Sequence, residues 1–362
     1  MKSFITKVGS VTVRAGKWSR GTLSVAKDPN GRIATIPLWI AAGRDVLADK
    51  RFVVGALLGG AHGDESNGPE LVNRVCQALD PAQMHGMLMV LPVMNPWGFA
   101  ERMRMVPYDQ RDLNRCYPGH SDGSFTLKVA HTILNSVVRL CDFVIDVHDA
   151  GTRIVLVPHA RVHIKPPDDP SVTLGMAFGS DVVLLRQAEP GMLAGEARKQ
   201  FGTNVVSLEI GGALQVSESI QERATAGVLN ILKSQGLVEG QLVLPPHQHL
   251  LKSRHTCLAE LSGIQTTYVQ LGQVVAKGEP LYRILDPLTG KQAMRRAEGC
   301  GVVLARNLSA QIDKGAPSIA ILEFSSCEAS AILKTNIVHN RSDRHTVVLK
   351  SAQGWSHRSH HL

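Results

Sequence analysis

The sequence lacks features that would place it at once in several common classes. Its six cysteines contain no C-x-x-C pair, which favours reduced thiols over a disulfide framework or a thiolate metal cage. No apolar run approaches the roughly 18 residues that a membrane-spanning helix needs, and the N-terminus has no sustained apolar segment of the signal-peptide kind. We therefore expect a soluble, cytoplasmic protein that does not associate with membranes.

The positive charge is not concentrated in the way that nucleic-acid binding requires. The formal net charge is +8. Residues 338–362 contribute four basic residues and one acidic residue, and the remaining 337 residues therefore carry only +5. There is neither a basic helix pattern nor an interleaving of basic and aromatic residues, so no nucleic-acid partner is expected. The segment 331–362 also contains five of the fifteen histidines and is interpreted as a polar, flexible tail.

The middle of the chain has an α/β pattern. At 44% hydrophobic residues the chain can bury a substantial core, and residues 1–45 alternate in short stretches typical of strands. Apolar runs predict strands at 52–59, 87–94, 142–148, 153–158, 181–185 and 204–210. Helical periodicity predicts helices at 69–79, 125–140, 171–178, 191–200 and 217–235, the first with Pro69 as its first residue. We predict an α/β domain at 1–245, with a mixed sheet flanked by helices.

The pattern changes after a polar, proline-broken segment at 240–251, which is the predicted linker. Short β-type stretches with Lys-Gly turns follow, and this pattern of strands and turns occurs twice, in two successive halves. This predicts a smaller all-β domain at 250–330 that resembles the barrel-sandwich fold of lipoyl and biotinyl carriers. Arg295 stands where such a carrier needs a lysine, so the domain is interpreted instead as a lid over the cleft or as an oligomer surface. Whether the protein is a homo-oligomer stays open.

The candidate site begins with a pair of metal-ligand residues. His62 and Glu65 are three residues apart just after an apolar run, and His148 ends another such run. Zinc hydrolases typically hold the metal with three protein ligands, often two His and one Glu, and leave the fourth position for water. In α/β sheets, ligands gather at the carboxyl ends of strands, where Asn95 and Glu209 also lie.

Each of these residues also has a structural interpretation. His62 could be a turn histidine and Glu65 a carboxylate that favours a helix N-terminus. Arg104 could belong to a solvated face, and residues 112–115 could form a turn rich in local side-chain hydrogen bonds. Glu209 is harder to explain structurally, because a carboxylate in a buried strand is costly unless it has a function.

The motifs taken together resemble the succinylglutamate desuccinylase and aspartoacylase family, relatives of the zinc carboxypeptidases. Four of them occur in the family's order, and the resemblance extends over about residues 30–325. The motifs are Gly60-Ala61-His62-Gly63-Asp64-Glu65, Arg104 with Asp112-Leu113-Asn114-Arg115-x-Tyr117-Pro118-Gly119, Asp146-Val147-His148, and Leu208-Glu209-Ile210-Gly211-Gly212. The resemblance implies a zinc-carboxypeptidase-like fold and a zinc-dependent amidohydrolase that removes an acyl group from an N-acyl amino acid or similar small amide.

The resemblance also implies a role for each site residue. His62, Glu65 and His148 would bind one Zn²⁺ per chain. Asp112 would accept the free ring N–H of His62 and fix the orientation of that ring. Glu209 would be the general base, and Arg104 would stabilise the oxyanion. Asn114 and Arg115 would bind a substrate carboxylate.

Two positions depart from the family pattern beside the site. Asp149 is often Thr in relatives and Tyr117 is often Phe, which puts the substrate rather than the chemistry in question. The segment 149–165, with Arg153, Arg161 and Lys165, could recognise an acidic substrate or could be solvated. Two alternatives stay open: a carboxypeptidase-like metallopeptidase acting on short peptides, and a catalytically inactive zinc-binding protein.

Overall fold

The computed structural model describes residues 5–28, 30–47, 52–163, 169–212, 215–252 and 254–324. The predicted tail at 331–362 and Lys165 lie outside the described residues. Within those ranges no helix is long and apolar enough to cross a bilayer.

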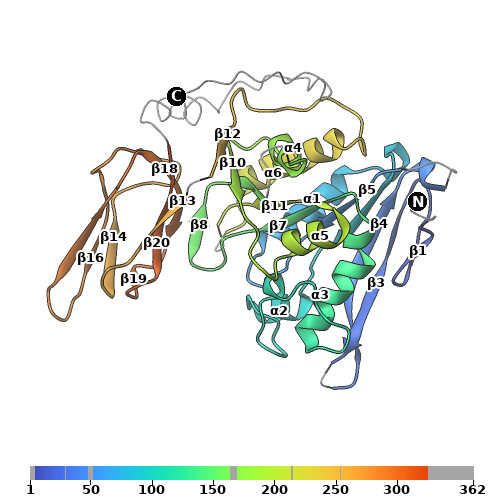
Figure 1. The fold of residues 1–362 in the computed structure, drawn as a ribbon, viewed down its shortest axis with the longest axis horizontal. Coiled ribbons are helices and arrows are strands. Elements are labelled where there is room, and N and C mark those ends of the chain that lie inside the picture. Colours follow the sequence, from blue (N-terminus) through green and yellow to red (C-terminus); the bar gives the residue numbers. More distant parts are fainter. Residues whose placement is uncertain are drawn as a thin grey trace.

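A nine-stranded mixed sheet forms the centre of the molecule, in the order β12-β10-β9-β11-β7-β5-β6-β4-β3 (Figure 1). Its strands are β3 (Lys17–Lys27), β4 (Ile33–Ala42), β5 (Val54–Leu58), β6 (Met87–Leu91), β7 (Phe143–His148), β9 (His159–His163), β10 (Val182–Arg186), β11 (Asn204–Glu209) and β12 (His249–Leu251). The neighbours β11, β7, β5 and β6 are parallel, whereas β9 runs antiparallel to β11, and β4 antiparallel to both β6 and β3. The predicted mixed sheet is confirmed.

Helices cover both faces of this sheet. They are α1 (Asn67–Ala78), α2 (Pro96–Glu101), α3 (Phe125–Ser136), α4 (Ser171–Ala177), α5 (Leu193–Phe201) and α6 (Glu218–Ser234). Successive residues of a strand point to opposite faces, so Leu57 packs with the helices α1, α4 and α6, and Leu58 belongs to the opposite core with α3 and α5. The strands β5, β6 and β7 are buried along their whole length, as expected when helices cover both faces.

The predicted elements are present with small shifts of their ends. The helix predicted at 125–140 stops at Ser136, because Val137 has non-helical angles, and a short 3₁₀ turn, η4 (Val138–Leu140), follows. Helix α1 begins at Asn67, so Pro69 is its third residue and not its first. Proline is tolerated there because the first-turn N–H groups have no intrahelical partner. The other short elements are β1 (Lys7–Val8), β2 (Val11–Thr12), η1 (Arg44–Leu47), η2 (Pro81–Gln83) and η3 (Leu113–Arg115).

Residues 254–324 form two packed sheets, here called the β module. Its strands are β13 (Arg254–Leu258), β14 (Gly263–Thr267), β15 (Val274–Val275), β16 (Pro280–Leu285), β17 (Gln292–Arg296), β18 (Gly301–Asn307), β19 (Gln311–Ile312) and β20 (Pro317–Glu323). One sheet has the order β13-β20-β18-β15, the other β17-β16-β14-β19, and an apolar core lies between them.

Two strands pair in a way that the domain boundary predicted at 240–251 does not anticipate. The strand β8 (Ile154–Leu156) pairs antiparallel with β18 of the β module, although it precedes the module by about a hundred residues. Conversely, β12 lies at the end of the predicted linker and pairs with β10 at the edge of the large sheet. Figure 1 shows the β module beside this edge, next to β8, β10 and β12.

The cysteines agree with the expectation of reduced thiols at all described positions but one. Cys76, Cys116, Cys141 and Cys257 are buried and are not disulfide-bonded. Cys300 is disulfide-bonded, so the expectation is wrong there. Cys327 lies outside the described residues.

Candidate metal centre and active site

The candidate site lies where three parallel strands of the large sheet end. His148 is the last residue of β7, and Glu209 is the last residue of the adjacent strand β11. The two are direct partners in the parallel register, so their side chains share one face of the sheet. His62 and Glu65 lie in the loop that leads from the end of β5 into α1.

Glycine allows this loop to pack tightly. A Cβ atom on Gly63 would lie 1.9 Å from the carbonyl carbon of Gly98 in α2, a distance that no side chain can occupy. Gly60 has a φ of +62°, which glycine adopts without the steric penalty of other residues. The two glycines therefore turn the chain after β5 and bring His62 back over the sheet edge.

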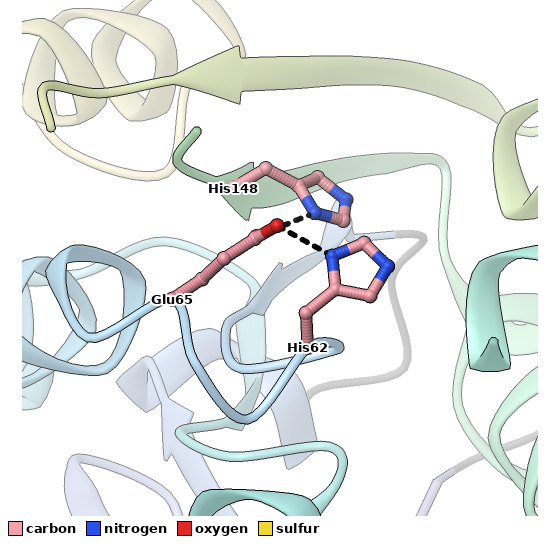
Figure 2. Close-up of side chains that lie close together, drawn as sticks. All are labelled: His62, Glu65 and His148. Atoms are coloured by element: carbon pink, nitrogen blue, oxygen red, sulfur yellow. Dashed lines mark hydrogen bonds and ion pairs between the residues drawn. The ribbon is translucent and has the colours of Figure 1, made fainter. Parts of the chain in front are cut away.

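The structure brings His62, Glu65 and His148 together. One ligand atom from each lies within 4.8 Å of the others, and all three residues are buried. The Nδ1 atom of His62 is 2.6 Å from Glu65 Oε1, and the Nδ1 atom of His148 is 3.1 Å from Glu65 Oε2. Figure 2 shows both imidazole rings turned toward the Glu65 carboxylate.

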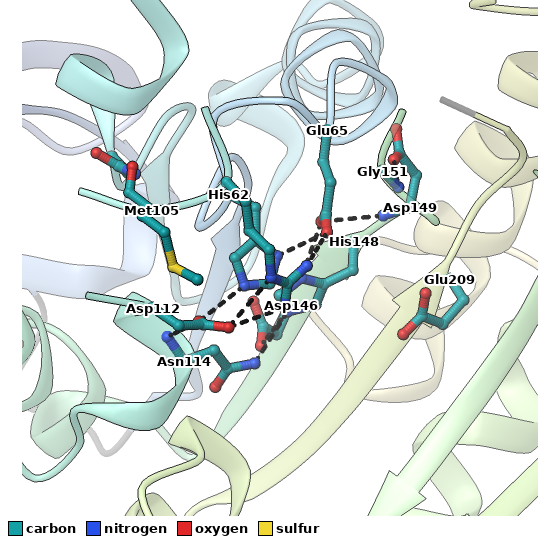
Figure 3. Close-up of polar contacts among 12 residues, drawn as sticks. His62, Glu65, Met105, Asp112, Asn114, Asp146, His148, Asp149, Gly151 and Glu209 are labelled. Carbon is teal, nitrogen blue, oxygen red and sulfur yellow. Dashed lines mark hydrogen bonds and ion pairs between the residues drawn. The ribbon is translucent and has the colours of Figure 1, made fainter. Parts of the chain in front are cut away.

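The opposite nitrogen of each imidazole faces an aspartate. The Nε2 atom of His62 is 3.0 Å from Asp112 Oδ1, and the Nε2 atom of His148 is 2.9 Å from Asp146 Oδ2 (Figure 3). Metal-binding histidines usually donate their second N–H to such a carboxylate, which fixes the ring and the tautomer. Both histidines are therefore held in the orientation that leaves Nδ1 for a metal.

Arg104 lies over the same cluster. Its guanidinium group donates to Asp112 Oδ2 through Nε (3.2 Å) and Nη2 (2.9 Å), and to Glu65 Oε1 through Nη1 (3.3 Å). When both imidazoles are neutral, the carboxylates of Glu65, Asp112 and Asp146 carry three negative charges. Arg104 carries one positive charge, so the cluster has a net charge of −2. A dication at the Nδ1 atoms would balance that charge. The two-His, one-Glu donor set is one that catalytic zinc sites use.

The pKa values reflect the same crowding of charge. Burial acts to raise the pKa of Glu65, but the charge of His62 and hydrogen bonds from both histidines outweigh it and hold that pKa below its usual range. Burial acts to lower the pKa of His148, yet the charge of Asp146 raises it well above its ordinary value. Burial, together with the charge of Glu65, raises the pKa of Asp149 to about 7.

Glu209 faces the metal ligands without bonding to them. It is 7% exposed and stands apart from the His62, Glu65 and His148 cluster in Figure 3. Its Oε1 atom pairs with Arg161 Nη1 at 2.8 Å. Arg161 belongs to β9, which lies within the segment 149–165, and the strand predicted at 153–158 corresponds to β8. Arg153 from the same segment is exposed.

The two predicted carboxylate binders are placed differently. Asn114 is buried, with Nδ2 3.5 Å from His148 Nε2 and Oδ1 accepting the N–H of Leu193 (3.0 Å). Arg115 is half-exposed and pairs with Glu189 at 3.2 Å. Among the contacts of the described residues, only those of Asn114 include a candidate metal ligand.

Sequence reasoning assigned no role to Asp146, although Asp146 and His148 are two residues apart in a strand and so point to the same face. Asn95 proves structural, because its Oδ1 accepts the N–H of Gly98 and caps α2.

The stretch Gly119–Gly123 matches the Gly-x-Ser-x-Gly pattern of serine hydrolases. It follows a 3₁₀ turn and not a strand, and Ser121 is exposed, so it is not a nucleophile elbow.

The mixed α/β sheet and the buried His-Glu-His cluster at its carboxyl edge define a candidate metallohydrolase architecture. Comparison with known proteins agrees with this class. The sequence model of the succinylglutamate desuccinylase/aspartoacylase catalytic domain matches residues 55–235. The chain belongs to the succinylglutamate desuccinylase/aspartoacylase family.

Individual relatives cover most of the chain. An N-alpha-acetyl-L-2,4-diaminobutyric acid deacetylase from Halomonas elongata is 30% identical over 285 residues, 74% of this chain and 80% of the relative. The product-bound structure of the ectoine utilization protein EutE (DoeB) from Ruegeria pomeroyi has a TM-score of 0.76 and 25% identity, covering 87% of this chain and 98% of that one. A succinylglutamate desuccinylase from Silicibacter sp. TM1040 has a TM-score of 0.75 and 24% identity, covering 88% and 100%.

Proposed function

We propose that the protein is a zinc-dependent amidohydrolase that removes an acyl group from an N-acylated amino acid or a similar small amide. The observation that carries the proposal is the convergence of His62 Nδ1, His148 Nδ1 and the Glu65 carboxylate in one buried cluster, with Glu209 beside it on the next strand. The deacetylase and desuccinylase names of its relatives support amide hydrolysis.

His62, Glu65 and His148 would hold one Zn²⁺. Bound there, the ion supplies Lewis-acid activation of water and of the scissile carbonyl. Asp112 and Asp146 keep the imidazoles oriented, because each accepts from a ring nitrogen that faces away from Glu65.

Glu209 acts as the general base that takes the proton from water and passes it to the leaving amine. Glu209 is the register partner of His148, so its carboxylate lies at the same edge of the sheet as the candidate metal ligands. It is not itself one of the three ligands. Arg104 stabilises the oxyanion that forms on the carbonyl oxygen, since its guanidinium is fixed beside Glu65 by Asp112.

Asn114 and Arg115 bind a carboxylate of the substrate. The pair between Arg115 and Glu189 is largely exposed, and such pairs contribute little free energy, so Arg115 can exchange Glu189 for a substrate carboxylate. A planar guanidinium matches that group in a bidentate manner.

We also propose the division into a catalytic domain at 1–245, a lipoyl-like domain at 250–330 and a tail at 331–362, with the β module limiting access to the cleft. The pairing of β8 with β18 supports this role, because it joins a strand of the catalytic domain to a sheet of the β module. A chain ending near Gly240 that folds and keeps full activity and specificity would refute this role.

The decisive test of the function is a pair of treatments on the zinc-loaded protein. Removal of zinc with a chelator should abolish hydrolysis of N-acyl amino acids. The variant Glu209→Gln should lose most activity while still binding one zinc per chain, as measured by metal analysis. Unchanged hydrolysis after either treatment would refute the mechanism, and preferential cleavage of short peptides would indicate a peptidase.

A further inference from the structure

Asn67, the first residue of α1, makes side-chain hydrogen bonds to two loops besides its own. It is 1% exposed and follows the candidate ligand Glu65 by two residues. Its Nδ2 atom donates to Oδ2 of Asp149 in the loop after β7, at 3.0 Å, and to the carbonyl oxygen of Gly212 in the loop after β11, also at 3.0 Å. A third acceptor, the carbonyl oxygen of Gln215, lies 3.4 Å from the same atom. One side chain therefore connects the loops that follow β5, β7 and β11.

The orientation of the Asn67 amide follows from its partners. Gln221 of α6 is fully buried, and its Nε2 atom donates to Oδ1 of Asn67 at 3.0 Å. A flipped amide would place Oδ1 against the Asp149 carboxylate and the Gly212 carbonyl, two groups that only accept hydrogen bonds. Both Nδ2 hydrogens are thus used within the protein, so Asn67 is placed to hold the chain and not to contact a substrate.

Asp149 links Asn67 to the candidate metal ligands. Its Oδ2 atom also accepts the backbone N–H of Asn67 (3.2 Å), and its Oδ1 atom accepts the N–H of Gly151 (2.9 Å). Its own N–H is donated to Glu65 Oε2 at 3.2 Å (Figure 3). That same oxygen is 3.1 Å from Nδ1 of His148. The position of the Glu65 carboxylate therefore depends on Asp149. The position of Asp149 depends in turn on Asn67.

The contact with Gly212 extends this network to the β module. Gly212 forms an antiparallel bridge with Val155, and Val155 of β8 pairs with Arg306 of β18. A Cβ atom on Gly212 would lie 2.6 Å from Val155 Cγ2, so Val155 packs directly against the backbone of this glycine. A continuous path of contacts therefore leads from the loop that bears Glu65 through Asn67 to the β module.

We propose that Asn67 is a positioning residue that holds Glu65 against His148 before the metal binds, and that it joins these ligands to the loop after β11. The inference rests on the proposed function, but only for the binding of a metal by this cluster. Asn67 satisfies buried oxygen atoms on both loops, and a buried acceptor that loses its donor costs free energy. Without the amide, the loops separate to reach other donors. The metal then has to draw its ligands together, which lowers its affinity.

The zinc affinity of the full-length protein tests the first part of the proposal. Asn67→Ala should bind zinc about 10- to 100-fold more weakly than the native protein, as measured by competition with a chelator of known affinity. The substitution is neutral, so the charge that attracts the ion is unchanged. Asn73→Ala is the matched control, because Asn73 lies on the same helix and its Nδ2 atom donates to the carbonyl oxygen of Pro69 at 2.8 Å. This control should leave the zinc affinity unchanged.

Asn67→Ser keeps the test valid if Asn67→Ala does not fold, which thermal unfolding of the metal-free proteins establishes. Serine is favoured at helix N-termini, and its single hydroxyl hydrogen can be donated to one of the two loops but not to both. We expect a loss of zinc affinity of about tenfold for this variant. Native zinc affinity in every Asn67 variant that folds would overturn the positioning role.

Hydrogen exchange tests the connection to the loop after β11, and a purely structural role would not change this readout. Zinc should slow the exchange of the backbone amides of β8 in the native protein, because the path from Glu65 reaches β8 through Asn67 and Gly212. In Asn67→Ala at saturating zinc this slowing should be lost, whereas in Asn73→Ala it should remain. Equal slowing in Asn67→Ala and the native protein, or no slowing in the native protein, would overturn the connection.

Hydrolysis of N-acyl amino acids, measured on the same preparations, separates this inference from the proposed function. Zinc binding that depends on Asn67 in a protein without hydrolytic activity would refute the amidohydrolase and leave the positioning role standing. Hydrolysis by the native protein, together with native zinc affinity in Asn67→Ala, would overturn the positioning role and leave the proposed function standing.

Discussion

The Nε2 atom of His148 lies 2.9 Å from Oδ2 of Asp146, two residues earlier on the same strand. Asp146 is 1% exposed, so this hydrogen bond is shielded from water. It holds the His148 ring with Nδ1 facing Glu65, and the sequence motif contains both partners.

Asp146→Asn should weaken zinc binding by about 10- to 100-fold, because the amide is a poorer and uncharged acceptor for the ring N–H. Competition with a chelator of known affinity measures the effect. Asp122→Asn is the matched control, since Asp122 is exposed in the turn before α3. Equal zinc affinity in Asp146→Asn and the native protein would contradict the orienting role.

Arg104→Lys should lower kcat by about 10²–10³ with little change in zinc content, because a lysine cannot bridge Asp112 and the oxyanion with a fixed planar group. Steady-state kinetics and metal analysis on the same preparation provide the measurement. The neighbouring Arg102→Lys makes the same chemical change outside the hydrogen-bonded cluster and should leave kcat unaffected. If both variants behave alike, the oxyanion role is wrong.

Gly63→Ala should destabilise the loop between β5 and α1 and reduce zinc affinity. A Cβ atom at this position meets the backbone of Gly98 at 1.9 Å, so the loop that bears His62 has to move. Gly299→Ala is the comparison, because its nearest neighbour would be a Glu323 oxygen at 3.7 Å. Thermal unfolding with and without zinc reports both effects, and native-like values for Gly63→Ala would refute the steric argument.

The buried His159 should make the native state sensitive to acid. Burial, with the charge of Arg161, lowers its pKa from 6.5 to about 3, so the unfolded chain binds a proton that the native state does not bind between these values. The free energy of unfolding is therefore unaffected by this group above about pH 6.5. It falls by up to ~1.4 kcal/mol per pH unit as the pH decreases toward 3.

His159→Asn tests this dependence, because its side-chain N–H can donate to Val157 O as Nδ1 of His159 does (2.8 Å) but does not titrate. Urea unfolding of the metal-free proteins at pH 7 and pH 5 should show a smaller loss of stability for the variant. A loss as large as that of the native protein would show that His159 does not cause the acid sensitivity.

Much of the fold was predictable because the pattern of apolar residues has a local cause. Strands β5, β6 and β7 are continuous apolar runs, and the amphipathic helices α1 and α6 have a clear period. The strand β9 was missed because His159, Arg161 and His163 give it a polar face, which is the face turned toward Glu209. Its pairing with β11, more than forty residues away, overrides its composition.

The candidate ligands could also be predicted, since His62, Glu65 and His148 lie at strand ends in motifs that follow the family's order, although each residue alone also has a structural interpretation. The pairing of Glu209 with Arg161 could not, because it depends on β9 pairing antiparallel with β11. The approach of Arg254 to Glu209 could not be predicted either, because it depends on the packing of β18 and β20 of the β module against β10.

The sequence by itself determined the family, the alternation of strands and helices and the identity of the donor atoms, because these depend on local periodicity and on the chemistry of single side chains. Only the tertiary structure decided which carboxylate faces each imidazole, that β8 joins the β module, and that Arg161 of β9 pairs with Glu209 of β11. These relationships follow from sheet register and from packing between residues far apart in the chain, and no local pattern encodes them.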